Sequence, residues 1–321
     1  MTDEPLSNFR YALKMAKIRD RNRGRVWDPC YKRWGFVWKD FTRDHRDMPY
    51  LRAVAIGLAL IFFFFIAAPL QWAAMRLRPD LARRVPLAFG RTLSFLLQVE
   101  VATDGLSRAS DGPRLLVANH VSWIDILVLC SIEPISFLAK QEIASWPVVS
   151  SFAKLQQTVF IDRKRRRAIP GANAAMAQRM LQGRSVLLFP EGTTGDGKAL
   201  LKFHSSHFAA ARDLLADTEE VETVLVQPIA IRYSSPSAAW TGNTLLLPHI
   251  WAILKGAPMR CDVAFGAPLP YARQTNRKII AQEAKAAIVD MLVALAPAGE
   301  AVNPLELEAA TQPILPWAKS A

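Results

Sequence analysis

The feature that most constrains the fold of this chain is an apolar run, AVAIGLALIFFFFIAAPL, from Ala53 to Leu70. The run contains no charged side chain and has the length of about 18 residues at which a helix can cross a bilayer. A cleaved secretory signal would lie at the extreme N-terminus, whereas this run follows a charged and aromatic segment, residues 1–50. It therefore predicts a membrane-anchoring helix that stays in the mature protein.

Basic residues lie on both sides of this run, so charge does not indicate an orientation. They are Arg43, Arg46 and Arg52 before it, and Arg76, Arg78, Arg83 and Arg84 after it. A spanning helix and a monotopic hairpin both fit this symmetry. In the hairpin, the partly amphipathic stretch Leu87–Val101 would be the second element, lying against the headgroups. We assign 51–101 as a membrane-associating helical segment.

The excess of positive charge points to a polyanionic partner. The chain has 40 Lys and Arg against 28 Asp and Glu, a formal charge of +12, which suits either nucleic acid or an anionic membrane. In residues 1–50 the basic residues are interleaved with Trp and Tyr, as in segments at membrane interfaces. A solvated arm is the alternative for this segment. The three cysteines, Cys30, Cys130 and Cys261, are too few and too widely spaced for a disulfide framework or a zinc site.

Residues 102–296 alternate short apolar runs with helical patterns. The predicted strands are Arg114–Ala118, Ile135–Ala139, Thr158–Ile161, Ser185–Phe189, Val224–Ile231 and Cys261–Phe265. The predicted helices are Ile124–Ser131, Trp146–Leu155, Ala168–Leu181, Phe203–Leu215 and Arg277–Leu295. The alternation predicts an α/β domain with a mixed sheet covered by helices on both faces. Residues 297–321, with four prolines, are predicted to be an extended tail.

The strongest chemical signal is NHVSWID, directly after the first of these strands. Two side chains five residues apart on one helix would point about 140° apart, so His120 must lie in the loop and fold back toward Asp125. The carboxylate would then hold one ring nitrogen and leave the other to take a proton from a hydroxyl group. A surface histidine beside a helix-capping Asp is the alternative for this pair alone.

A second signal is PEGTTGDGK, which follows the strand Ser185–Phe189. Its glycines allow close approach to a ligand, and Thr193 and Thr194 offer donors to a phosphate or an oxyanion. The segment from Gly192 to Lys198 also has the spacing of a nucleotide-binding P-loop, but Ala199 stands where that loop needs Ser or Thr. We therefore do not assign a nucleotide site.

A third signal is VFIDR, a strand that ends in Asp162 and Arg163 and continues as KRRR. A run of arginines binds phosphates, and similar patches occur in nucleic-acid-binding proteins. The position at a strand end favours a site role for Arg163 and a surface role for the rest.

Together NHVSWID, VFIDR, FPEGTT and QPIAI resemble, in order and spacing, the four sequence blocks of the glycerolipid acyltransferases. The resemblance extends from about Leu51 to Val293 and includes bacterial 1-acylglycerol-3-phosphate acyltransferases. It implies an acyltransferase domain with an N-terminal hydrophobic anchor. A serine hydrolase is disfavoured because the chain has no GxSxG elbow.

The resemblance also implies roles for particular residues. His120 and Asp125 would be catalytic. The acceptor's phosphate would be held by Arg163 of the second block and by Glu191, Gly192 and Thr193 of the third. Pro228 of the fourth block would shape the acyl-donor side. Lys140 matches a basic position that is common in the family, and Asn119 is grouped with the substrate-binding residues. Thr194 departs from the family, which often has Arg there. The stretch LPHIWAILKGAP is similar to bacterial lyso-ornithine lipid acyltransferases.

The sequence therefore predicts acyl transfer from acyl-CoA or acyl carrier protein to the free hydroxyl of lysophosphatidic acid. Lyso-ornithine lipid or another lysolipid is the alternative acceptor, and a basic membrane-tethered nucleic-acid binder is the alternative class. We expect no cofactor, no metal and no nucleic-acid partner. The expected location is the inner membrane, with the catalytic domain facing the cytoplasm.

Overall fold

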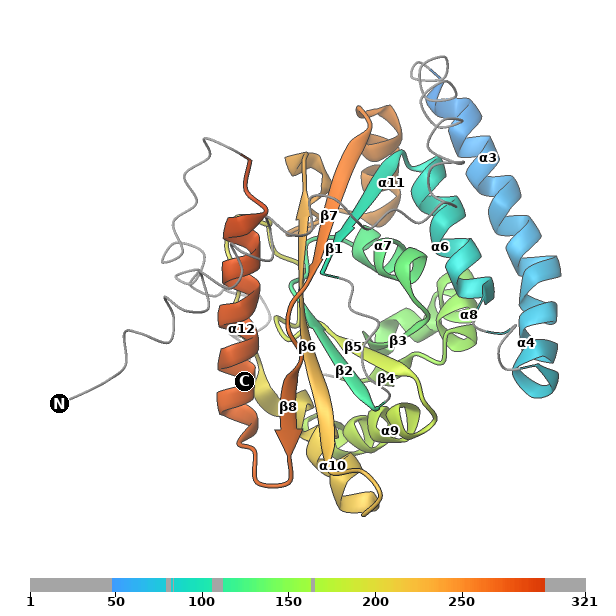
Figure 1. The fold of residues 1–321 in the computed structure, drawn as a ribbon. Coiled ribbons are helices and arrows are strands. Elements are labelled where there is room, and N and C mark those ends of the chain that lie inside the picture. Colours follow the sequence, from blue (N-terminus) through green and yellow to red (C-terminus); the bar gives the residue numbers. More distant parts are fainter. Residues whose placement is uncertain (1–47, 79–81, 83, 106–111, 163–164, 298–321) are drawn as a thin grey trace. The chain divides into compact units, whose positions relative to one another are not determined.

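The computed structural model describes residues 48–78, 82, 84–105, 112–162 and 165–297. The predicted arm and tail lie outside these ranges, apart from their inner ends. The first element is a continuous helical segment, Pro49–Leu77, that contains the predicted apolar run (Figure 1). It comprises α3 (Pro49–Phe62), a π-helical turn (Phe63–Ala67) and α4 (Ala68–Leu77).

The remaining helices and strands alternate as predicted. The strands are β1 (Val99–Asp104), β2 (Arg114–Ala118), β3 (Ile135–Lys140), β4 (Val159–Ile161), β5 (Ser185–Leu188), β6 (Thr223–Tyr233), β7 (Met259–Phe265) and β8 (Leu269–Ala272). The helices are α6 (Arg84–Leu96), α7 (Ile124–Ile132), α8 (Pro147–Leu155), α9 (Ile169–Leu181), α10 (Ala209–Asp217), α11 (Leu246–Lys255) and α12 (Arg277–Ala294). All six predicted strands and five predicted helices are present, with ends shifted by a few residues.

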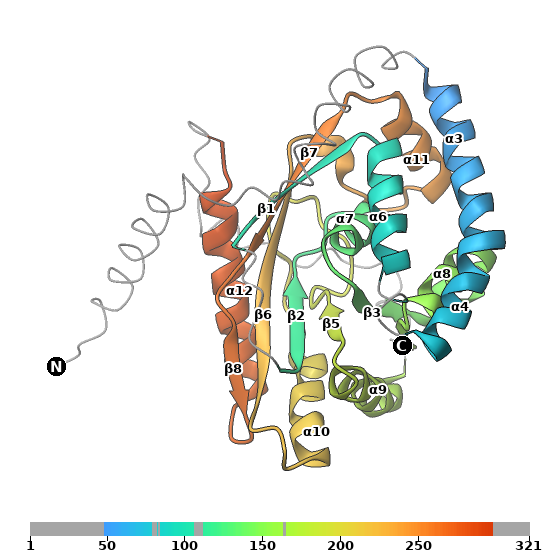
Figure 2. The ribbon, with the colours of Figure 1, turned by 45° about the vertical axis from the view of Figure 1, so that its right-hand side comes forward.

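The strands form one mixed sheet in the order β1-β7-β6-β2-β5-β3-β4, and β8 also pairs with β6 (Figures 1 and 2). The strands β6, β2, β5, β3 and β4 are mutually parallel, whereas β7 and β8 run antiparallel to β6. The carboxyl ends of β6, β2 and β5 therefore lie next to one another at one edge of the sheet.

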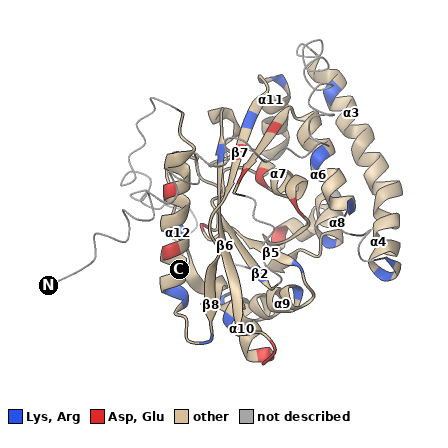
Figure 3. Ribbon diagram, viewed as in Figure 1, with Lys and Arg blue, Asp and Glu red and all other residues tan. Residues whose placement is uncertain are grey.

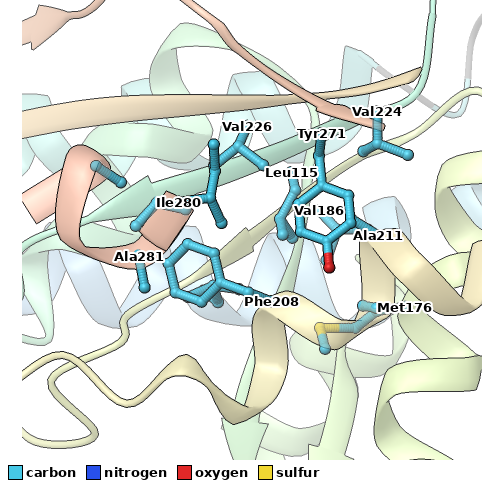
Figure 4. Packing of buried hydrophobic residues seen from close by; sticks show 14 of the residues in the cluster. Leu115, Met176, Val186, Phe208, Ala211, Val224, Val226, Tyr271, Ile280 and Ala281 are labelled. Atoms are coloured by element: carbon cyan, nitrogen blue, oxygen red, sulfur yellow. The ribbon is translucent and has the colours of Figure 1, made fainter. Parts of the chain in front are cut away.

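Both faces of the sheet are buried, which explains why its strands are continuously apolar. Leu115 and Val117 of β2 face a cluster formed by α9, α10 and α12, part of which is shown in Figure 4. Leu116 and Ala118 face the opposite cluster, which includes side chains of α6, α7 and α11. The two-residue period of a strand sends alternate side chains to the two layers.

The stretch Leu87–Val101 differs from its prediction as a headgroup-facing element. Most of it belongs to α6, whose Phe89 and Leu93 are buried in the sheet domain, and its last three residues begin β1, which pairs with β7. The amphipathic pattern therefore reflects packing against protein. The strands β1 and β8 and the helix α11 were not predicted.

The contact between α6 and α7 depends on Gly90. A Cβ atom at this position would lie 2.7 Å from the backbone nitrogen of Ser131 and 2.8 Å from the carbonyl oxygen of Leu127. We expect Gly90→Ala to lower the free energy of unfolding by about 1–3 kcal/mol, because the two helices must move apart. Gly171→Ala in α9 is the control, since nothing lies within 4 Å of its Cβ position. Urea denaturation in detergent measures both, and equal stability of the two variants would contradict this packing.

Candidate active site

Three side chains of the candidate site lie at the ends of neighbouring strands. His120 lies two residues beyond the end of β2, Glu191 three residues beyond the end of β5, and Tyr233 is the last residue of β6. Because these three strands are adjacent and parallel, their ends bring the three side chains together. Functional groups of α/β sheets commonly gather at this edge.

His120 and Asp125 form the predicted pair. The Nδ1 atom of His120 lies 2.8 Å from Oδ2 of Asp125, which is fully buried in the first turn of α7. The backbone N–H groups of Val121 and Ser122 donate to the same Oδ2 at 2.8 and 3.0 Å. Because Oδ2 thus acts as an acceptor, the proton lies on Nδ1 and Nε2 is left as the acceptor of the ring.

The Nε2 atom of His120 has no hydrogen-bond partner among the described residues, and the side chain is 17% exposed. The ring stacks on Phe189, with the ring centroids 3.9 Å apart and the planes within 13°. A partly accessible imidazole that is held in one tautomer and orientation can act as a general base toward a hydroxyl group.

Tyr233 is a site residue that sequence reasoning missed. Its hydroxyl donates to Oδ1 of Asp125 at 2.7 Å. Burial, together with the nearby carboxylate of Asp125 and the thiol of Cys261, raises the pKa of Tyr233 well above its usual value, so the hydroxyl keeps its proton. Tyr233 is 108 residues from Asp125 in the chain, and only the adjacency of β6 and β2 brings them together.

Glu191 joins two loops. Its Oε1 accepts the backbone N–H of His120 and its Oε2 that of Leu201, each at 2.8 Å. The carbonyl of His120 in turn accepts the N–H of Gly195 at 2.7 Å. Burial raises the pKa of Glu191 to about 7, although the two backbone hydrogen bonds oppose this effect. These contacts favour a positioning role for Glu191 over direct contact with an acceptor phosphate.

Two further predicted residues lie at β2 and β6, the strands that meet at the site. The side-chain amide of Asn119 donates to the carbonyl of Ile231 at 2.9 Å and accepts its N–H at 2.8 Å, which ties the end of β2 to β6. Pro228 lies where β6 changes partner, between residues 223–226 paired with β8 and residues 229–233 paired with β7. A proline is tolerated at such a break in the ladder.

The other predicted residues differ in placement. Gly192 has a φ of +74°, a left-handed conformation that favours glycine, and the half-buried hydroxyl of Thr193 has no partner among the described residues. Lys140 ends β3 at the same sheet edge, half-exposed and 3.5 Å from a carboxylate oxygen of Glu142. Arg163 lies outside the described residues.

The connection between β6 and α11 covers one side of the site. The hydroxyl of Thr194 donates to the carbonyl of Trp240, whose N–H donates to the carbonyl of Val121 at 3.0 Å. The indole N–H of Trp123 donates to Nδ1 of His249 in α11 at 2.9 Å. This connection is therefore bonded to the loop and helix start that carry His120 and Asp125. Within the described ranges, no group of three or more His, Cys, Asp or Glu side chains could hold a metal ion.

An oriented, partly accessible imidazole at the carboxyl edge of a mixed α/β sheet is the geometry expected of an enzyme site that activates a hydroxyl group. A sequence model of the acyltransferase family matches residues 98–232. It is 36% identical over 241 residues to a lyso-ornithine lipid O-acyltransferase from Brucella abortus, an alignment that covers 71% of this chain and 86% of that protein. With these matches, the chain belongs to the glycerolipid acyltransferase family.

Two further comparisons extend this result. A 1-acyl-sn-glycerol-3-phosphate acyltransferase from Neisseria meningitidis is 33% identical, over 58% of this chain and 72% of that protein. The crystal structure of the 1-acyl-sn-glycerophosphate acyltransferase from Thermotoga maritima matches with a TM-score of 0.51 and 20% identity, over 78% of this chain and 100% of that chain. At this identity the structural match supports the fold alone.

The hydrogen bond from Tyr233 can be tested with Tyr233→Phe. We expect kcat/KM to fall by about tenfold or more, because a hydrogen bond to a charged group contributes roughly 1.5–3 kcal/mol. The control is Tyr271→Phe, a buried tyrosine in the cluster on the other face of the sheet (Figure 4). A kcat/KM in Tyr233→Phe equal to that of the wild type would contradict the assignment.

The buried carboxyl group of Glu191 predicts a pH-dependent stability. Its pKa rises from 4.5 to about 7 on folding, so between these values the folded state binds more protons than the unfolded state. The free energy of unfolding should therefore fall as the pH rises through this window, by about 3 kcal/mol at most from this group. Urea denaturation across the window should show the fall in the wild type, and Glu191→Gln should lack this contribution. Identical pH dependence in both proteins would refute it.

Proposed function

We propose that this enzyme transfers a fatty acyl group to the free hydroxyl of lyso-ornithine lipid. The observation that supports this acceptor most is the similarity to lyso-ornithine lipid O-acyltransferases, which extends over most of their length: 86% of the Brucella abortus protein and 83% of the Rhizobium meliloti protein, each at 36% identity. Lysophosphatidic acid, the acceptor favoured from the sequence, is the second candidate. It is supported by the similarity to the Neisseria meningitidis relative, but both the identity and the coverage of that match are lower.

The third sequence block also favours an acceptor without a phosphate. An ornithine headgroup offers an amine and a carboxylate in place of a phosphate group. Thr194, which occupies a position that is often Arg in the family, donates its hydroxyl to the carbonyl of Trp240. The Thr194 side chain therefore binds another loop of the protein, and it offers no positive charge to a phosphate headgroup.

In the proposed mechanism, Nε2 of His120 takes the proton of the acceptor hydroxyl as its oxygen attacks the thioester carbonyl carbon of acyl-CoA or acyl carrier protein. Asp125 holds the ring and stabilises the imidazolium that forms. The unpartnered hydroxyl of Thr193 is a candidate donor to the developing oxyanion. When the tetrahedral intermediate collapses, the C–S bond breaks and the leaving thiolate takes the proton back from His120.

The apolar helix Pro49–Leu77 supports membrane attachment, because by length and composition it could cross a bilayer. One of its faces nevertheless packs on the domain at both ends and in the middle. Arg52 donates to the carbonyls of Leu96 and Leu254 at 3.1 and 2.8 Å, the ring of Phe63 lies 4.9 Å from that of Phe89, and Gln71 donates to the carbonyl of Ala82 at 2.7 Å.

The outer face of the same helix is exposed and apolar from Leu51 to Leu77, and its charged residues lie toward its two ends (Figure 3). A helix that packs along its length on a folded domain fits a monotopic position in the membrane interface better than a free span. We propose this arrangement on the inner membrane, with the domain on the cytoplasmic side.

The acceptor is tested with purified enzyme and both lysolipids. We expect a higher kcat/KM for lyso-ornithine lipid than for lysophosphatidic acid, and His120→Ala should lower kcat for the preferred acceptor by roughly 10²–10⁴-fold. Arg163→Ala should reduce turnover of lysophosphatidic acid more than that of lyso-ornithine lipid, because only the former offers a phosphate. A clear preference for lysophosphatidic acid would overturn the acceptor, and a fully active His120→Ala protein would overturn the mechanism.

A further inference from the structure

Exposed apolar side chains in the described part of the chain are unevenly distributed. Beyond residues 48–77, the large hydrophobic side chains that are exposed are Trp146, Val149, Leu181, Leu245, Leu247 and Ile279. The first two lie at the start of α8, which packs against α4, and the two leucines at 245 and 247 lie at the start of α11, which packs against α3. Four of the six therefore belong to the two helices that flank the apolar helix.

Leu245 and Leu247 are 70% and 76% exposed, the highest values among these six side chains. The helix that carries them is held on its inner side by buried His249, Ile253 and Leu254. These two leucines thus project from a fixed helix and are not part of a loosely packed core. Leaving such side chains in water is unfavourable relative to burying them in an apolar environment.

Contacts with α3 place α11 beside the apolar helix. The rings of Trp251 and Tyr50 are 5.0 Å apart, and Arg52 donates to the carbonyl of Leu254. The ammonium group of Lys255 lies 5.8 Å from the centre of the Trp251 ring. Leucines, a tryptophan and a lysine on one short helix are the side chains that favour a lipid interface.

The same helix also adjoins the active site. His249 accepts the indole N–H of Trp123, which lies between His120 and Asp125 in the chain. The indole N–H of Trp240 donates to the carbonyl of Thr244, the residue before Leu245, at 2.8 Å. The two exposed leucines therefore lie on a segment that is bonded directly to the catalytic loop.

We propose that Leu245 and Leu247 insert into the lipid surface beside the active site, so that the start of α11 forms a second membrane contact at which the lysolipid enters. The partner is the bilayer itself, and the entry step rests on the proposed function, in which the acceptor is a membrane lipid. With this contact, the acyl chain of the acceptor passes from the bilayer to His120 beside an apolar segment.

Insertion is tested without turnover by attaching an environment-sensitive fluorophore to Leu247→Cys in a Cys30→Ser background, since Cys130 and Cys261 are buried. With vesicles of phosphatidylethanolamine and phosphatidylglycerol, we expect a blue shift of the emission. The matched control is Ile279→Cys on α12, an exposed apolar residue (54% exposed) on a helix of the opposite layer. A shift at both positions, or at neither, would overturn the proposal.

The entry step is tested with Leu245→Gln combined with Leu247→Gln. We expect kcat/KM for lyso-ornithine lipid in vesicles to fall about tenfold, with no change for a short-chain, water-soluble lysolipid. Leu181→Gln combined with Ile279→Gln should change neither. Equal losses on both substrates, or no loss on vesicles, would overturn entry at α11. If the wild type failed to acylate lyso-ornithine lipid, the proposed function would fail, while the fluorescence result would still decide insertion.

Discussion

Asp125 has no solvent exposure, and its carboxylate accepts four hydrogen bonds, from His120, Val121, Ser122 and Tyr233. A carboxylate in such a place is tolerated only when donors replace the water that it has lost. Each donor therefore has a double effect, because it stabilises the buried group and also fixes where the imidazole ring can lie. The orientation of the His120 imidazole follows from this need for hydrogen bonds around one buried pair of oxygen atoms.

The order of the strands brings these donors to the carboxylate of Asp125. Three come from the short loop after β2, whereas Tyr233 comes from the end of β6, and the backbone of His120 is held by Glu191 after β5. Asn119 fastens β2 to β6 at the point where the site begins. A change in the register of either neighbouring strand would move a donor away from the carboxylate or release the His120 loop.

Local patterns were sufficient for much of this arrangement. Six of the eight strands of the sheet were predicted, because both faces are buried and these runs are continuously apolar. The His120–Asp125 pair was predicted because five residues span one loop and one helical turn. Tyr233 could not be predicted, since the expected strand ended at Ile231 and no local pattern indicates which distant hydroxyl reaches a carboxylate. The burial of Glu191 could not be predicted either, because a Glu in a turn rich in glycine and threonine is usually solvated.

Helix α6 misled the prediction for a related reason. An amphipathic pattern shows that one face avoids water, but it does not distinguish a neighbouring helix from a lipid surface. Gly90 was the one sign of a neighbouring helix in this stretch, since a residue without a side chain allows two helix backbones to approach closely.

The packing of the apolar helix has a practical consequence for work with this enzyme. Phe63 and Ala67 of that helix belong to the same buried cluster as α6 and α7, and Arg52 supplies donors to the last carbonyl of α6 and to a carbonyl in the final turn of α11. Removing residues up to Leu77 to obtain a water-soluble fragment would expose part of this buried cluster to water. It would also leave the carbonyls at the ends of two helices without their hydrogen-bond donors. The apolar helix is therefore an integral part of the fold, and work with the protein should retain it.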